Sequence, residues 1–400
     1  MGRFCHLIMV NGDGNNNKYY QMTEKNGAIE VEYGRVDSTK SYKTYPLNKW
    51  DSIVKSKLKK GYKDVTDLIA TKVDVFENKK RFISDDKDVQ DLFDQLEKWA
   101  KDTISQNYKV NSNKVTRKMI DEAQELINRL SISFAENKNY IELNKILTEI
   151  YMVIPRRMNN VRDYLLKDND KEHIKEVIDD EQKLLDTMSG QVMANDTDNN
   201  NECEVVNVLE NLGIRIKMVS DNNVIKNIKK MMGETANLIG KVFEVTNITT
   251  ETKYDKIFKS DDTSQELLLW HGSRNQNWFN ILQTGLLIRP SGAVYTGSMF
   301  GDACYFANKA RKSIGYSSLS GSYWARGNES KSFIALFKVN VGKQKHVYKH
   351  TSECYSFNEN NIKPYNSVYA HGGIDLRNDE FMIYNPNRCT IKYLVEINKN

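Results

Sequence analysis

Four short segments in the last third of the chain carry side chains that could bind and react with a polar ligand. The first, residues 267–274, reads LLLWHGSR, an apolar run that delivers His271, Gly272 and Ser273 into a turn. An imidazole, a backbone without a side chain and a hydroxyl at a strand end together suit the binding of a polar ligand. A histidine at a strand end is more often structural, so this segment gains meaning only from its neighbours in the sequence.

The next two segments add glycines and aromatic rings. Residues 296–308 read TGSMFGDACYFAN, and residues 311–316 read RKSIGY. The two glycines of the first segment let the backbone approach a ligand closely. Tyr305 and Tyr316 could form a slot for a flat ring, because offset stacking contributes about 0.5–1.5 kcal/mol beyond area burial.

The fourth segment, residues 378–385, reads NDEFMIYN and puts Glu380 at the start of an apolar run. Such a carboxylate is usually a solvated strand end. Here it follows three other patterns, so that WHGSR, TGxMFGxxxYFA, KSxxY and DExxxY occur in this order over about 115 residues. Together they resemble the catalytic domain of the poly(ADP-ribose) polymerases, over essentially residues 205–400.

This resemblance implies that NAD is consumed as a substrate and that no metal takes part. Glu380, His271 and Tyr305 would be the catalytic residues. The residues that the resemblance assigns to NAD binding are His271, Gly272, Ser273, Tyr305, Lys312, Ser313 and Tyr316. Gly272 and Ser313 would hold the carboxamide, the two tyrosines would sandwich the ring, and His271 would bind the adenosine-side ribose. No GxGxxG pattern lies between a strand and a helix, so hydride transfer is not expected.

The implied chemistry suits a carboxylate at position 380. Departure of nicotinamide from NAD leaves a sugar cation of the oxocarbenium kind that glycosidases stabilise with carboxylates. Glu380 would supply negative charge where positive charge develops, and it could polarise an acceptor hydroxyl as a general base does. Lys312 could hold that carboxylate in place.

The set of His271, Tyr305 and Glu380 is the family's pattern for members that form polymers, so we expect chain elongation. Two departures lie near where an acceptor would bind. Residues 342–378 are short compared with the corresponding region of many family members, and Asn378 replaces a tyrosine often found two positions before the glutamate. Leu287 occupies a place where the family often has an arginine, which Arg289 could replace. A mono-ADP-ribosyltransferase therefore stays an alternative. The other alternative is an inactive nucleic-acid-binding scaffold, whose sign would be the loss of His271 or Glu380.

Three patterns along the chain indicate the elements that position these residues. Residues 3–47 alternate short apolar runs with Gly, Asn and Asp turns and predict hairpins, and residues 50–58 have helical spacing. Residues 84–193 carry apolar residues three and four apart and predict a helical bundle. The polar residues 194–201 predict a loop, and the strand-like runs ELLLW, ACYFA, SFIALFKVNV, EFMIY and TIKYLVEI dominate the rest. The expected class is α+β with several domains and a mostly antiparallel catalytic sheet.

Composition and charge limit the kinds of ligand and environment that suit this chain. With 39% hydrophobic and 28% charged residues the chain is expected to fold. Residues 1–80 hold 15 Lys and Arg against 10 Asp and Glu, an excess that equals the net charge of +5 for the whole chain. This excess favours phosphate contacts, although a solvated lysine-rich face explains it equally well. The dispersed cysteines include no CxxC pair, which argues against a structural zinc site. No apolar run is long enough for a membrane span.

Two further resemblances concern the front of the chain. Tyr33-Gly34-Arg35 and the following KWDSIVKSKLKKGY resemble the WGR domain of the same family, with Tyr33 in the place of its tryptophan. The runs DKDVQDLF and KILTEIYMVIP resemble the family's helical regulatory domain. We therefore expect domains at residues 1–82, 83–200 and 201–400. The implied partners are DNA ends or breaks as activators and protein acceptors including the chain itself, with nuclear localisation in a eukaryote and cytoplasmic localisation otherwise. The nucleic-acid contacts would come from Arg35, Lys57, Lys59 and Lys60.

Overall fold

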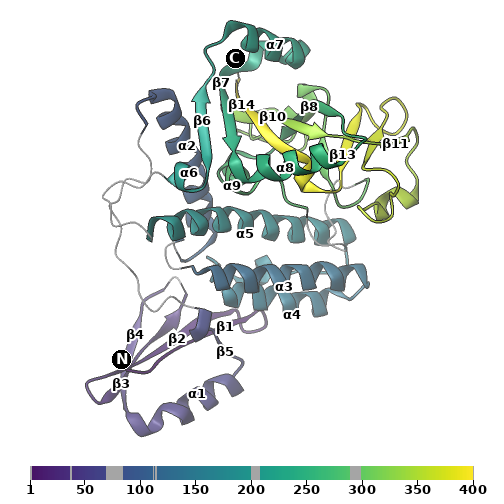
Figure 1. The fold of residues 1–400 in the computed structure, drawn as a ribbon. Helices are drawn as coiled ribbons and strands as arrows, with labels where there is room; N and C mark the ends of the chain where they lie inside the picture. The colour runs from purple at the N-terminus through teal and green to yellow at the C-terminus, as the bar shows by residue number, and fades with distance from the viewer. Residues whose placement is uncertain are drawn as a thin grey trace. The chain divides into compact units, whose positions relative to one another are not determined.

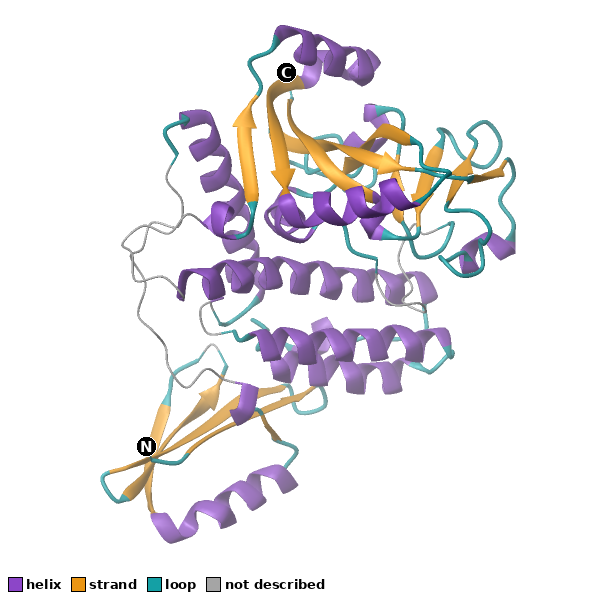
Figure 2. Cartoon of the chain, in the orientation of Figure 1, coloured by secondary structure: helices purple, strands orange, loops and turns teal. Residues whose placement is uncertain are grey.

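The computed structural model describes residues 2–36, 38–68, 84–110, 112, 115–199, 208–288 and 299–399. The described residues form two compact units. One unit contains the described residues up to 68 together with residues 102–195, and the other contains residues 84–101, residues 196–199 and the described residues from 208 onward. Helices and several antiparallel sheets are present (Figures 1 and 2), which confirms the predicted α+β class. The three predicted domain boundaries stay a prediction.

The N-terminal module, residues 4–68, is a twisted sheet with one helix. Its strands lie in the order β4-β3-β2-β1-β5. Their bounds are β1 Phe4–Asn11, β2 Asn16–Lys25, β3 Ala28–Arg35, β4 Ser41–Pro46 and β5 Lys63–Asp64. Asn26 and Gly27 both have positive φ between β2 and β3, as a two-residue hairpin turn requires. Helix α1, Trp50–Lys59, buries Trp50 against Leu7 and Met22 of the sheet, which confirms the predicted strands and helix.

The helical region of the same unit is built from α3 (Arg117–Ala135), α4 (Tyr140–Val153) and α5 (Lys171–Asn199). Thr116 and Asn139 accept backbone hydrogen bonds at the starts of α3 and α4, as N-cap residues do. Ile8 and Val10 of β1 belong to the same buried cluster as Leu130, Leu147 and other residues of these helices. The N-terminal sheet and the helices therefore share one hydrophobic core.

The prediction of a loop at residues 194–201 was wrong for residues 194–199, because α5 continues to Asn199. Asn and Asp are weak helix formers, but none of these residues is Gly or Pro, so nothing in the backbone ends the helix. Val192 and Ala194 are buried and anchor the last described turns. Residues 200 and 201 lie outside the described residues.

The second unit is a pair of sheets with short helices around them. One sheet has the order β6-β7-β14-β10-β8, and the other has the order β11-β12-β13-β9, with β11 and β12 parallel. The strands of the first sheet are β6 Ile214–Met218, β7 Ile239–Asn247, β8 Glu266–Gly272, β10 Lys331–Asn340 and β14 Cys389–Asn398. The strands of the second sheet are β9 Cys304–Phe306, β11 Gln344–Val347, β12 Ser367–Ala370 and β13 Glu380–Ile383. The five runs that sequence predicted as strands correspond to β8, β9, β10, β13 and β14.

Helices surround the first sheet in Figure 1. Those that follow residue 208 are α6 Val208–Asn211, α7 Asn222–Met232, α8 Ile248–Ser260, α9 Trp278–Thr284 and α10 Ala310–Ile314. The first part of α2, Lys87–Asn107, belongs to this unit: Phe93 meets Phe279 edge-on, and Trp99 meets Phe333. Among the described residues, no helix combines the length and apolar character that crossing a bilayer requires.

Candidate active site

A backbone bridge between the first and the second sheet of this unit brings His271 next to Tyr305. Trp270 in β8 exchanges backbone hydrogen bonds with Ala307 beyond β9, at N···O distances of 2.8 and 2.9 Å. The next residue of β8, His271, then places its Nδ1 3.0 Å from the carbonyl oxygen of Tyr305. Two of the predicted catalytic residues are thereby held together by backbone geometry, although 34 positions separate them in the sequence.

The imidazole of His271 is held in one tautomer. A carbonyl oxygen can only accept, so Nδ1 carries the proton and Nε2 is left as an acceptor. The rings of Trp278, Phe306 and Phe337 meet the imidazole edge-on, at centroid distances of 6.3, 5.8 and 5.8 Å. Burial lowers the pKa of His271 below 6.5, with the hydrogen bond to Tyr305 opposing the change. The ring is neutral at pH 7 and can accept a hydrogen bond from a sugar hydroxyl.

Gly272 and Ser313 are packed so closely that only glycine fits at position 272. A Cβ atom there would lie 1.9 Å from the carbonyl oxygen of Ser313. Ser313 is buried in α10. The hydroxyl of Ser273 accepts a hydrogen bond from the side-chain amide of Asn277 at 2.9 Å, so this hydroxyl is already engaged within the chain. The close approach places Gly272 of β8 directly against Ser313 of α10.

The two tyrosines have different surroundings. The hydroxyl of Tyr305 accepts from the Phe300 amide at 3.0 Å and donates to the Gly301 carbonyl at 2.8 Å, and burial raises its pKa. Tyr316 is 40% exposed, and ionisation of its hydroxyl would raise the pKa of Tyr305 further, so the two hydroxyl groups are within electrostatic reach. The Tyr305 hydroxyl is thus fixed by two hydrogen bonds, whereas the Tyr316 ring is partly open to solvent.

Glu380 enters the site from β13, which pairs with β9. Met382 of β13 lies opposite Tyr305, so Glu380 is two positions from the partner of Tyr305 on the same strand. Its carboxylate contacts the ammonium group of Lys312 in α10, and both side chains are mostly buried, with 13% and 14% exposed. Burial lowers the pKa of Lys312 to about 8, and the neighbouring carboxylate of Asp379 opposes the change. The contact with Glu380 favours the charged ammonium as well, and it fixes the carboxylate against α10.

Asp379 is the first residue of the DExxxY pattern, but sequence reasoning assigned it no role. Its carboxylate accepts hydrogen bonds from the Gly372 amide, the Tyr369 hydroxyl and the Asn308 side chain, at 2.9, 3.0 and 2.9 Å. Burial raises its pKa, but these hydrogen bonds outweigh burial and the net pKa is lowered. Asp379 thus stays ionised and ties β12, β13 and the end of β9 together beside Glu380. Its signal in the sequence was only its position next to the predicted glutamate.

The structure therefore brings together His271, Gly272, Tyr305, Lys312, Ser313 and Glu380 through β8, β9, β13 and α10. Leu287 is described and half exposed. Residues 289–298 lie outside the described residues, and with them Arg289 and the first glycine of the TGSMFG segment.

In the N-terminal module, the four residues predicted to contact nucleic acid differ in their surroundings. The guanidinium of Arg35 donates to backbone carbonyls of Asn15, Met158 and Asn159, the last at 2.8 Å, and so joins β3 to the chain after α4. Lys57 lies over the Tyr20 ring at 3.7 Å, and burial lowers its pKa. Lys59 and Lys60 are exposed.

A basic cluster formed by Lys18, Lys43, Lys57 and Lys60 emerges from this packing. The charges of the other three lysines also lower the pKa of Lys57, so each of them lies within electrostatic reach of Lys57. Lys43 lies over the ring of Tyr33 at 5.8 Å. Lys18 and Lys43 were missed because they lie on separate strands, and only the folded sheet brings them beside α1.

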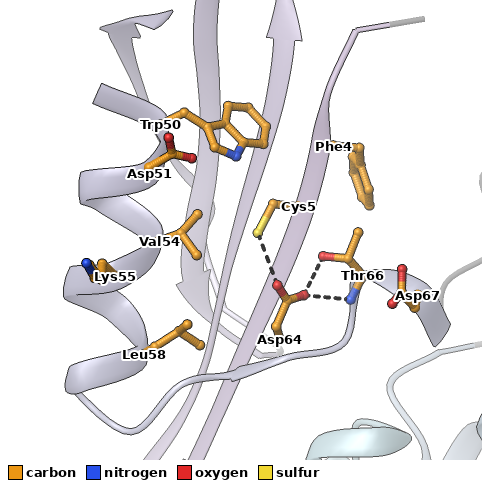
Figure 3. Close-up of a pocket in the computed structure, with 10 residues that line it drawn as sticks. All are labelled: Phe4, Cys5, Trp50, Asp51, Val54, Lys55, Leu58, Asp64, Thr66 and Asp67. Carbon is orange, nitrogen blue, oxygen red and sulfur yellow. Dashed lines mark hydrogen bonds between the residues drawn. The ribbon is translucent and has the colours of Figure 1, made fainter. Parts of the chain in front are cut away.

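An open cleft of about 640 Å³ borders the same helix (Figure 3). Apolar side chains of Trp50, Val54 and Leu58 line it together with three carboxylates, those of Asp51, Asp64 and Asp67. Asp64 accepts hydrogen bonds from the amide and hydroxyl of Thr66. The carboxylates make this cleft unsuited to phosphate, and it shares no residue with the candidate active site.

Comparison with known proteins agrees with this geometry. A family model described as the poly(ADP-ribose) polymerase catalytic domain matches residues 221–399. "Putative poly [ADP-ribose] polymerase-like 100L" of Invertebrate iridescent virus 6 is 30% identical over 165 residues, which cover 40% of this chain and 86% of that protein. "Uncharacterized protein 101L" of the same virus is 37% identical over 209 residues, covering 52% of this chain and 86% of that protein.

A longer relative matches nearly the whole chain. "Poly [ADP-ribose] polymerase 1" of Danio rerio is 24% identical over 414 residues, which cover 96% of this chain but 37% of that protein. The family model and the two relatives named as polymerases lead to the same conclusion. This chain belongs to the poly(ADP-ribose) polymerase family, and it is an NAD+ ADP-ribosyltransferase.

Proposed function

We propose that this chain transfers ADP-ribose from NAD to protein acceptors, itself included, and then extends the first unit into a polymer. The observation that supports this most is the meeting of Glu380, His271 and Tyr305 through β9. His271 and Glu380 come from different sheets, and the full set is the pattern that the resemblance associates with polymer formation.

The reaction follows from the charges of these groups. The bond between nicotinamide nitrogen and ribose C1′ breaks, its electron pair leaves with nicotinamide, and positive charge develops on the ribose. Glu380 supplies the opposing negative charge in a largely buried place, where electrostatic stabilisation is strong. An acceptor oxygen then bonds to C1′, and its proton passes to the Glu380 carboxylate. Lys312 keeps that carboxylate in position, and neutral His271 accepts a hydrogen bond from a ribose hydroxyl.

We propose further that DNA ends stimulate the transfer by binding the N-terminal module. The enzyme would be nuclear in a eukaryote and cytoplasmic otherwise. The basic cluster supports this, because it gathers four ammonium groups on one part of the module, and those of Lys43 and Lys57 lie over tyrosine rings of the sheet. Neutralising phosphates with these ammonium groups releases counterions, which favours binding.

Automodification with labelled NAD tests both parts of this proposal. With blunt or nicked DNA we expect a ladder of products on a gel and a faster rate than without DNA. Equal rates with and without DNA would remove the stimulation, and the absence of any labelled protein would remove the transfer.

A mono-ADP-ribosyltransferase is the second candidate, and one observation favours it. The connection between β12 and β13 is a short turn, residues 371–379, closed by a hydrogen bond from the Gly373 amide to the Leu376 carbonyl. It offers little chain to bind a growing polymer near Glu380. A single step of mass addition under conditions of full NAD turnover would favour this candidate over elongation.

A further inference from the structure

Tyr316, the more exposed tyrosine of the candidate active site, stacks on an aromatic ring that lies eight positions later in the sequence. The indole of Trp324 stacks on Tyr316 with a centroid distance of 6.0 Å and an interplanar angle of 19°. Tyr323 meets the indole edge-on at 4.6 Å and 88°. Three aromatic rings therefore follow one another outward from the site, from Tyr316 to Trp324 to Tyr323.

The loop after α10 is folded so that it returns Trp324 to this place. The backbone amides of Trp324 and Ala325 both donate to the carbonyl of Gly315, at 2.8 and 2.9 Å. Position 315 carries no side chain, and a Cβ atom there would lie 3.0 Å from Cδ1 of the indole. The indole thus rests directly on the residue before Tyr316.

The remainder of the loop is tightly constrained. Leu319 is buried in the core of the first catalytic sheet, and the Ser320 amide donates to the Glu329 carbonyl at 2.7 Å. Gly327 lies so close to Ser318 that a Cβ would fall 2.3 Å from its backbone. Arg326 has a φ of 48°, a left-handed conformation that costs free energy for a residue with a side chain. Such a conformation persists only where the surrounding contacts determine it.

Exposure distinguishes these rings from a hydrophobic core. Trp324 is 59% exposed and Tyr323 is 76% exposed. Tryptophan is highly buried on average, and this one gains little by burial. What the loop provides is a fixed plane against one face of Tyr316.

We propose that Trp324 is a positioning residue for the nicotinamide group, a role that rests on the proposed use of NAD in this site. The indole covers one face of Tyr316, so the nicotinamide ring would stack on the opposite face while the indole holds the phenol ring in its plane. Without it, the ring of Tyr316 would have to be ordered when the ligand binds. The loss in affinity from ordering one such side chain and from the weaker ring contact is roughly 3–10-fold.

Binding of nicotinamide, measured by isothermal titration calorimetry on the full chain, tests this inference without relying on turnover. In W324A we expect roughly 3–10-fold weaker binding, with W324F restoring most of it. In G315A the added Cβ presses on the indole without removing it, and residue 315 has right-handed φ and ψ that alanine adopts freely. We therefore expect G315A to weaken binding as well.

The kinetic split sharpens the test. W324A should raise KM for NAD while kcat changes by less than about twofold, because the indole acts on binding and touches no reacting atom. Tyr355→Ala removes another exposed aromatic ring of the same unit, 62% exposed, and serves as the matched control that leaves both parameters unchanged. Thermal unfolding of each variant shows whether the fold is kept.

The outcomes separate failure of this inference from failure of the proposed function. If the unmodified chain neither binds nicotinamide nor consumes NAD, the proposed function fails with it. If the unmodified chain binds nicotinamide and folded W324A binds it equally well, Trp324 has no positioning role. If folded W324A binds it more tightly, the indole occupies the ligand's own place, and the inference is overturned in the opposite sense.

Discussion

The candidate active site and the N-terminal module were both predicted from short motifs, and they differ in how the motif residues are used. In the active site, a hydrogen bond joins His271 to Tyr305, and the pairing of β13 with β9 places Glu380 near Tyr305. In the N-terminal module, Arg35 donates to carbonyl groups of Asn15, Met158 and Asn159. A charged residue in a motif can thus serve the fold itself, and its hydrogen-bond partners reveal which use it has.

The largest effect on the active-site side of this comparison is expected for Gly272→Ala. The new Cβ would lie 1.9 Å from the Ser313 carbonyl, which forces α10 away from β8. Because a misplacement of about 1 Å can cost about 100-fold in rate, NAD consumption should fall by at least that factor. Nicotinamide release from labelled NAD measures it. Activity within a few-fold of the unmodified chain would show that Gly272 and Ser313 need not be in contact.

The pH dependence of kcat/KM for NAD should show an acid limb from His271. Burial lowers the pKa of this imidazole below 6.5, so the ring stays neutral at pH 7 and gains a proton only as the pH falls further. The proton would occupy Nε2 and remove the acceptor for the ribose hydroxyl. The unfolded chain binds this proton more readily than the folded one, so the free energy of unfolding should also decline as the pH falls below about 6.5. A limb centred above pH 6.5 would contradict this assignment.

Arg35→Ala should lower the free energy of unfolding by about 1–3 kcal/mol, because it leaves backbone carbonyls without their donor. Urea denaturation followed by circular dichroism measures this. We expect its affinity for DNA, measured below the unfolding transition, to change little. If Arg35→Ala instead kept its stability and lost DNA binding, the motif residue would serve the ligand and the contrast between the two regions would fail.

Lys60→Ala should give the smallest effect and the opposite pattern. Lys60 is exposed, so stability should change by less than about 0.5 kcal/mol. Loss of one phosphate contact should weaken DNA binding several-fold and reduce the slope of log affinity against log salt concentration by about 1. Fluorescence anisotropy at several salt concentrations provides that slope. An unchanged slope would remove Lys60 from the interface.

The predictable part of the fold was what local pattern determines. Apolar spacing predicted α1 and the helices of residues 84–193, and strong apolar runs predicted β8, β10 and β14. Strands β6 and β12 were missed because both are short: β6 has five residues and buries only Ile214, and β12 has four residues. The helical end of α5 was missed because its polar residues resemble a loop, whereas burial of Val192 and Ala194 favours the helix.

The candidate site divides in the same way. Resemblance gave the residue types, and the structure adds how they are held, through the Trp270–Ala307 bridge, the aromatic rings around His271 and the hydrogen bonds to Asp379. These contacts join residues far apart in the sequence and have no local signal. Trp324 was missed for the same reason, since only the returning loop places its indole on Tyr316.

Replacement of Glu380 by Gln gives the most direct test of convergence on one dinucleotide. The amide keeps the size of the side chain but removes the negative charge beside the developing sugar cation. We expect E380Q to bind a non-reactive NAD analogue within a few-fold of the unmodified chain, while nicotinamide release and chain elongation fall by about 100-fold or more. Retained release and elongation with unchanged binding would show that Glu380 does not act on the dinucleotide that His271 and Tyr305 hold.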